Sequence, residues 1–233
     1  MVEVCIPLLS LIGLELILGI DNIIFISILC DKLPEKNRAK LRYWGLGLAM
    51  LMRLLLLATL SWILKLDATL LTLFQIQISG KGIILILGGL FLIYKSSKEL
   101  LIKSEAKNQN KTEIKKGSFS TLLGEIIILD LVFSIDSIIT AVGMVKELWI
   151  MYVAVIVTVV IMLFASKPIS EFVAKNQSFK ILALCFLIMI GVSLIGEGLH
   201  LEIQKGYIYF SMLFAFFVDI VQMKILNPTK NEV

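Results

Sequence analysis

LELILGIDNIIFI, at residues 14–26, holds two carboxylates inside a run that is otherwise almost entirely apolar. The segment ILDLVFSIDSIITAVG, at residues 128–143, repeats the pattern: an acid, five mostly apolar residues, an aspartate, an amide or hydroxyl residue and two isoleucines. The four acids are Glu15, Asp21, Asp130 and Asp136. One carboxylate at the centre of a membrane helix costs about 2.5–3.5 kcal/mol on insertion scales, so such residues normally face the bundle interior and serve a function.

Long apolar runs place the chain among helical membrane proteins, with the lipid bilayer as its partner. Of its 233 residues, 58% are hydrophobic, and the mean hydropathy is +0.95. We predict an all-α polytopic fold with about seven transmembrane helices, because apolar runs of about 18 residues or more span a bilayer. The expected spans are 5–29, 43–64, 80–95, 119–144, 148–166, 181–197 and 206–224. The short apolar stretch 69–79 is expected to be re-entrant or interfacial, or to extend the third span.

The basic residues are distributed unevenly between the two sides that these spans define. Loops 32–42, 95–116 and 167–180, together with the C-terminal end, hold seventeen of the 22 Lys and Arg residues. The other side holds four, and Arg53 lies within a span. Because cytoplasmic loops carry an excess of Lys and Arg, we predict a multi-pass protein of the cytoplasmic (inner) membrane with its N-terminus outside and its C-terminus in the cytoplasm. The small net charge of +4 does not indicate a nucleic-acid partner.

Each acidic segment opens a group of three spans, and the two segments enter the membrane from opposite sides. We therefore expect two inverted three-helix repeats plus a seventh helix, a common transporter architecture. The expected units are the first repeat at 1–95, a cytoplasmic basic linker at 96–118, the second repeat at 119–197, and the seventh helix with a cytoplasmic tail at 198–233.

The candidate metal ligands are all oxygen donors. They are Glu15, Asp21, Asn22, Asp130, Asp136 and Ser137. Hard oxygen ligands suit Mg²⁺, Ca²⁺ and Mn²⁺. The three cysteines are scattered and there is a single histidine, so a zinc or copper site is not expected. A shared proton is another way to compensate the acids, because close carboxylates cannot all ionise together.

The spacing within each motif leaves the arrangement of the acids open. Positions six residues apart on a straight helix lie about 9 Å apart along the axis and about 120° apart around it. Unwinding near Gly19 or Ser134 would bring both acids to one ion and free backbone carbonyls as ligands. Alternatively, the acids mark successive stations on a path. A structural role is the further alternative, in which interhelical hydrogen bonds or Arg53 hold the buried charges.

Four further charged residues are candidates for a secondary pathway or for coupling. Arg53 would pair with a buried acid, or replace the cation when the site is empty. Glu125 lies three helical turns before the second aspartate of its span and could form a cytoplasmic entrance, or simply favour the helix N-terminus. Glu197 could belong to an outer vestibule, and Asp219 could meet Lys224 near the interface.

The two acidic motifs resemble the signature segments of the TerC family. Further similar stretches are RYWGLGLAMLMRLLLL at residues 42–57 and FLIMIGVSLIGEGLHLEIQKGYIYFSMLF at residues 186–214. The resemblance covers most of the chain except the loop 95–117. It implies a membrane protein similar to LysE-type transporters that exports manganese and is linked to tellurium resistance. It also implies that the family's intramembrane acidic positions are Glu15, Asp21, Asp130 and Asp136, with Asn22 and Ser137 matching beside them.

The expected function is export of a divalent cation through a buried carboxylate site, with Mn²⁺ favoured by the resemblance and proton exchange as a candidate coupling. No prosthetic group and no enzyme activity are expected. An intramembrane hydrolase would need only two aspartates as an acid–base dyad, which is fewer than the four repeated acids here. The alternatives are a non-transporting membrane assembly or tellurite-resistance factor and an exporter of a small organic substrate. No oligomeric state is predicted.

Overall fold

The computed structural model describes residues 2–59, 69–73, 76–108, 117–145, 147–201 and 203–226. The helices in these ranges are α1 (Val2–Cys30), α2 (Glu35–Ala58), α4 (Gly80–Asn108), α5 (Phe119–Met144), α6 (Leu148–Lys175), α7 (Gln177–Gly198) and α8 (Lys205–Leu226). Two short strands, β1 (Thr69–Leu73) and β2 (Ile76–Ser79), form an antiparallel hairpin just before α4. The predicted helical membrane fold is confirmed, and the hairpin is an addition to it.

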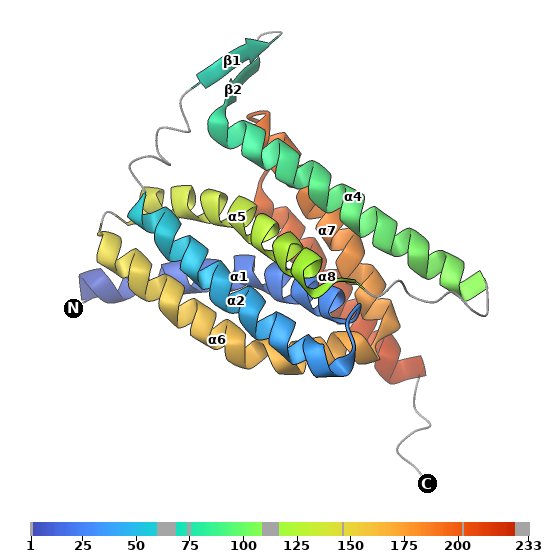
Figure 1. Ribbon diagram of the computed structural model, residues 1–233. Coiled ribbons are helices and arrows are strands. Elements are labelled where there is room, and N and C mark those ends of the chain that lie inside the picture. Colours follow the sequence, from blue (N-terminus) through green and yellow to red (C-terminus); the bar gives the residue numbers. More distant parts are fainter. Residues whose placement is uncertain are drawn as a thin grey trace.

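Six helices in the described part of the chain are long and apolar enough to cross a membrane, namely α1, α2, α5, α6, α7 and α8. The apolar stretch of α4, residues 82–94, is shorter and is bounded by Lys81 and Lys95. Figure 1 shows α4 lying beside α7, and the two run antiparallel, because the start of α4 meets the end of α7. The chain is therefore a polytopic membrane protein, with α4 packed onto one of its spanning helices.

The helices pack in pairs that join the two halves of the chain. α1 packs along α6, α2 along α5 and α4 along α7, whereas α8 packs mainly on α7 (Figure 1). The end of the bundle where the strands precede α4 is named the hairpin end; α5 and α7 also finish there, and α8 begins there. The opposite end is the one where α1 finishes and α2 begins.

Two hydrophobic clusters fill the interior of the bundle. One includes Ile23, Leu46 and Leu129 and extends toward the opposite end. The other includes Leu11 and Leu57 and extends toward the hairpin end. Because α1, α2 and α5 each contribute to both clusters, the middle of these three helices lies at the junction between two apolar regions. A charged side chain buried at that junction needs a polar or charged partner.

Three helices extend well beyond their predicted spans, by two turns or more. α2 begins at Glu35 instead of near residue 43, and its first turns carry the basic residues of loop 32–42. α4 continues to Asn108, so part of the predicted linker 96–118 is helical, and an ion pair of 2.6 Å between Lys32 and Glu99 anchors this part. α6 continues to Lys175. The extensions are polar, so a search for apolar runs does not detect them. Residues 60–64, the end of the predicted second span, lie outside the described ranges.

The stretch 69–79 is a β-hairpin, so the predicted extension of the third span through it is wrong. Leu73 pairs with Ile76, and Thr69 pairs with Ser79. The sequence Ile-Gln-Ile-Ser of β2 alternates apolar and polar residues, which is the period of a strand. The high apolar content of the stretch obscures this alternation.

Glycines set the distance between α4 and α7. A methyl group added at Gly82 would lie 2.6 Å from the carbonyl oxygen of Gly198, and one added at Gly191 would lie 2.8 Å from the carbonyl oxygen of Gly89. Such contacts are too short for any side chain, so the two backbones touch directly. Small residues allow this close approach between membrane helices, where van der Waals packing replaces the hydrophobic effect as the main attraction.

Replacing Gly89 by alanine should destabilise the protein. The added methyl group would lie 2.8 Å from the side chain of Ile195 and would press on the backbone of Gly191. Overpacking of this kind costs about 1–3 kcal/mol, so the purified variant should unfold at a lower temperature in detergent. Gly47→Ala on α2 is the matched control, because nothing lies within 4 Å of the added methyl group. Equal unfolding temperatures for the two variants would contradict the backbone contact.

Candidate functional site

The two acidic motifs lie on unbroken helices. α1 passes through Gly19 and α5 passes through Ser134 without losing helical structure, so neither helix unwinds at the residue that the sequence suggested. The acids of each motif therefore stay on different faces and at different heights of their helix. The structure places them in three surroundings: a cluster at the middle of the bundle, a cluster at the hairpin end, and an apolar groove.

The central cluster joins α1, α2 and α5 through one arginine. Arg53 on α2 donates to Glu15 through Nη1, and to Asp130 through Nη2 at 3.0 Å and Nε at 3.3 Å. Asn22 donates its side-chain amide to Asp130 at 3.3 Å, and Ser134 donates its hydroxyl to the same carboxylate at 3.1 Å. All five side chains belong to residues that are at most 6% exposed.

The charges of the central cluster are not balanced one to one. Two carboxylates share a single guanidinium, so a negative charge remains in excess when both acids are ionised. A small cavity adjoins the cluster and is lined by Asn22, Arg53 and Asp130 together with apolar side chains of α1, α2, α5 and α6. Carboxylate, amide and hydroxyl oxygens thus meet beside a cavity in the middle of the bundle.

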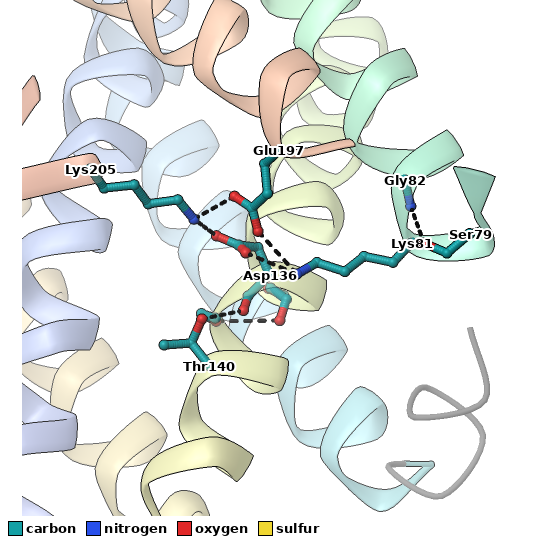
Figure 2. Close-up of polar contacts among 9 residues, drawn as sticks. Ser79, Lys81, Gly82, Asp136, Thr140, Glu197 and Lys205 are labelled. Carbon is teal, nitrogen blue, oxygen red and sulfur yellow. Dashed lines mark hydrogen bonds and ion pairs between the residues drawn. The ribbon is translucent and has the colours of Figure 1, made fainter. Parts of the chain in front are cut away.

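The hairpin-end cluster consists of Asp136, Glu197, Lys81 and Lys205. Figure 2 shows the two lysines reaching the two acids from opposite sides, Lys81 from the start of α4 and Lys205 from the start of α8. Lys81 lies 3.0 Å from Glu197 and 3.7 Å from Asp136. Lys205 lies 2.8 Å from Glu197 and also pairs with Asp136. In this cluster the negative charges of the two acids equal the positive charges of the two lysines.

The remaining predicted ligands stand apart from these two clusters. Ser137 donates its hydroxyl to the backbone carbonyl of Ser134 on its own helix at 3.3 Å. Asp21 is 4% exposed and makes no hydrogen bond or ion pair to another described residue. It lines an apolar groove between α1, α6, α7 and α8, whereas its neighbour Asn22 lines the cavity beside the central cluster.

Glu125 and Asp219, the two secondary candidates not yet placed, belong to neither cluster. Glu125 pairs with Lys95 of α4 at 2.5 Å, toward the opposite end of the bundle. Asp219 lies on α8, and one of its carboxylate oxygens is buried without a hydrogen-bond partner among the described residues. The side chain of Lys224, its suggested partner, lies outside the described part of the chain.

Sequence reasoning missed the roles of Lys81 and Lys205. They are two of the four basic residues on the less basic side of the membrane. Each begins, or nearly begins, an apolar helix at the end where Asp136 is buried. A lysine in this position can turn its long stem back along the bundle and reach a buried acid, which is the signal that could have identified them.

The clusters share one electrostatic principle, which is that cations of the protein itself compensate the buried acids. In the described ranges no three His, Cys, Asp or Glu side chains come close enough together to hold a metal ion. Guanidinium and ammonium groups occupy the places next to the carboxylates. An incoming cation would have to displace Arg53 at the centre, or Lys81 and Lys205 at the hairpin end.

The chain is similar to known membrane proteins along almost its whole length. The model of the integral membrane protein TerC family matches residues 2–232. A UPF0053 protein of Haemophilus influenzae is 49% identical over 229 residues, which is 98% of this chain and 97% of that protein. The UPF0053 inner membrane protein YgdQ of Escherichia coli is 45% identical over 94% of this chain and 91% of its own. For the Escherichia coli UPF0053 protein YegH, also 45% identical, the match spans 42% of that protein. No solved structure matches the chain.

Replacing Arg53 by methionine should destabilise the protein strongly. The change leaves Glu15 and Asp130 buried without their shared cation, and breaking a buried pair in this way costs about 3–5 kcal/mol. Thermal unfolding of the purified protein in detergent measures the loss, and Lys175→Met, which removes an exposed cation from the end of α6, is the control. The triple variant Arg53→Met, Glu15→Gln, Asp130→Asn should recover most of the stability. If it stays as unstable as Arg53→Met, the arginine acts through packing and not through charge.

Proposed function

Because this chain belongs to the integral membrane protein TerC family, we propose that it exports a divalent metal cation, with Mn²⁺ as the favoured substrate. The family resemblance supports the choice of manganese, and the oxygen-only donor set suits a hard cation of this kind. The proposed process is transport without covalent chemistry, so no catalytic residue and no prosthetic group are assigned.

One observation carries this proposal. Glu15 and Asp130, the first acids of the two repeated motifs, converge on one guanidinium in the middle of the bundle. They come from α1 and α5, which lie in different halves of the chain. Buried ionisable residues at such a depth mark ion pathways in membrane proteins. The candidate substrate ligands are the carboxylates of Glu15 and Asp130, with the side-chain oxygens of Asn22 and Ser134 beside them.

Arg53 can compensate the negative charges of Glu15 and Asp130 at the stages of a transport cycle when no metal is bound. While no metal is bound, the guanidinium holds both carboxylates. An arriving M²⁺ competes for the same oxygens and releases the arginine, and the arginine returns when the metal leaves. The alternative is a pair of unpaired buried carboxylates, which costs several kcal/mol per ion. A proton can fulfil the same role on one carboxylate, so exchange of metal for protons is the proposed coupling.

The hairpin-end cluster extends the proposed path away from the centre. Asp136 lies six residues after Asp130 on α5, which corresponds to about 9 Å along the helix axis. Lys81 and Lys205 compensate Asp136 and Glu197 as Arg53 compensates the central acids. We assign this cluster to the outer part of the path, and the pair of Glu125 with Lys95 to the inner part.

The pairing of helices supports the proposed inverted repeats. In the proposed repeats, α1, α2 and α4 correspond to α5, α6 and α7, respectively. The packing of α1 on α6 then corresponds to the packing of α5 on α2. The packing of α4 on α7 corresponds to itself. These are the three most extensive helix pairs of the structure. The two acidic motifs then occupy corresponding helices that cross the membrane in opposite directions, as in transporters with alternating access.

We further propose that the protein lies in the inner membrane with its N-terminus outside and its C-terminus in the cytoplasm. The excess of Lys and Arg at the opposite end of the bundle supports this orientation. A green fluorescent protein fused after the C-terminus should therefore fluoresce, since it folds in the cytoplasm. An alkaline phosphatase fusion at the same position should be inactive. The reverse result would overturn the orientation.

Manganese export predicts a loss of cell-associated metal. In manganese-sensitive cells, expression of the wild-type chain should lower accumulated manganese, measured by elemental analysis. Glu15→Gln, Asp130→Asn and Asp136→Asn should each return it to the level of cells without the protein, because each removes a carboxylate of the proposed path. Glu171→Gln, which neutralises an exposed acid on α6, should behave like the wild type.

Two results would contradict this function. Equal manganese with and without the wild-type chain would exclude manganese export under these conditions. Retained export by all three neutralised variants, with protein levels matched by immunoblot, would show that the buried acids do not form the path. A tellurite phenotype that survives the same variants would instead favour a non-transporting assembly factor, and metal-independent efflux of an amino acid would favour an organic substrate.

A further inference from the structure

A large apolar groove lies between α1, α6, α7 and α8, and no member of either charged cluster is among the residues that line it. The space in it, including the part open to the surroundings, is about 1750 Å³. The groove therefore has chemistry of its own, which the proposed metal path does not use.

Aromatic rings form much of the groove wall. The rings that line it are Phe172, Phe179, Phe186, Tyr209, Phe210 and Phe216. Phe179 holds Phe172 and Phe216 in edge contacts, with ring centroids 5.2 Å and 4.8 Å away. Aromatic faces attract cations through the ring quadrupole, and the attraction grows when water is excluded. A wall of this kind suits a ligand that is apolar and positively charged.

Asp21 is the one acid among the described residues that line the groove. It is 4% exposed and has no hydrogen-bond or ion-pair partner among the described residues. An ionised carboxylate in apolar surroundings is costly unless a cation pairs with it or a proton neutralises it. At the two charged clusters the protein provides that cation from its own side chains, but in the described part of the groove it does not.

We propose that the groove binds a lipophilic organic cation of the quaternary ammonium or phosphonium class, with Asp21 as its counter-charge. A metal ion would need several oxygen ligands, and among the described residues that line the groove only Asp21 and Tyr209 offer side-chain oxygens. A primary ammonium carries three N–H donors that all need acceptors. A quaternary cation carries none, so one carboxylate and aromatic faces satisfy it.

Binding of tetraphenylphosphonium to the purified full-length chain tests this proposal. Equilibrium dialysis in detergent, without divalent metal, should show saturable binding at one site. Tetraphenylborate, which has the same shape and the opposite charge, should not compete or bind. Because the assay contains no metal and measures no transport, its result is independent of whether the chain exports manganese.

Two substitutions separate the charge from the apolar surface. Asp21→Asn should weaken tetraphenylphosphonium binding by about tenfold or more, as expected when a buried charge pair loses one partner. Tyr209→Leu keeps an apolar side chain but removes a ring, and should weaken binding by about threefold or more. Glu171→Gln, an exposed acid on the same α6 that helps to line the groove, should leave binding unchanged.

Three outcomes would overturn the proposal. Equal binding of tetraphenylphosphonium and tetraphenylborate would show an apolar groove that holds lipid chains without selecting for charge. Unchanged binding by Asp21→Asn, with an elution profile on size-exclusion chromatography matching the wild type, would remove the counter-charge role. The absence of saturable binding by a wild-type sample that elutes as a single folded species would exclude the site itself.

Discussion

The shared arginine at the centre of the bundle is the interaction on which the rest of the structure depends. α1, α2 and α5 meet where two hydrophobic clusters join, and each contributes a charged group that has no access to water. Desolvation makes each of those groups unfavourable alone, so the three helices must be held in the register that lets Arg53 reach Glu15 and Asp130 together. The three charged side chains therefore fix how α1, α2 and α5 are placed relative to one another. Packing between their apolar faces alone would allow other arrangements, because those faces are similar.

The same rule organises the hairpin end with different partners. There α5 ends its path through the bundle, and its second aspartate meets lysines from the first turns of α4 and α8 and a glutamate from the end of α7 (Figure 2). The contact with Lys205 ties α8 to the rest of the protein, even though much of the surface of α8 is exposed in the single chain. Asp21 is the exception, since it has neither a cation nor a polar partner among the described residues, and this difference separates the groove from the two clusters.

The membrane fold could be predicted from the sequence because long apolar runs and buried acids are strong, local signals. The repeated motif also predicted Glu15 and Asp130 as site residues, and both contact Arg53. The six predicted oxygen donors do not converge on one site. The sequence could not show this, because residues such as Asp130 and Asp136 lie on different faces of an intact helix and the sequence does not say which neighbour each face contacts. The ion pairs of Lys81 and Lys205 were not predicted, because a lysine near the end of a membrane helix usually indicates topology. The sequence also does not show how far the long side chain reaches into the bundle. The β-hairpin was not predicted, because the alternation of apolar and polar residues in its strand is only a few residues long.

The glycine crossing of α4 and α7 has a mechanical consequence for any movement of the bundle. Gly82 and Gly89 are seven residues apart, as are Gly191 and Gly198, so each helix presents two contact points on one face, about two turns from each other. Sliding one helix along the other would carry side chains into positions that accept only a bare backbone. The close backbone contact therefore favours movement of α4 and α7 as a unit over sliding of one helix along the other. In the transport cycle proposed above, we therefore expect the change of access from one side of the membrane to the other to come from α1, α2, α5 and α6 moving against the pair of α4 and α7.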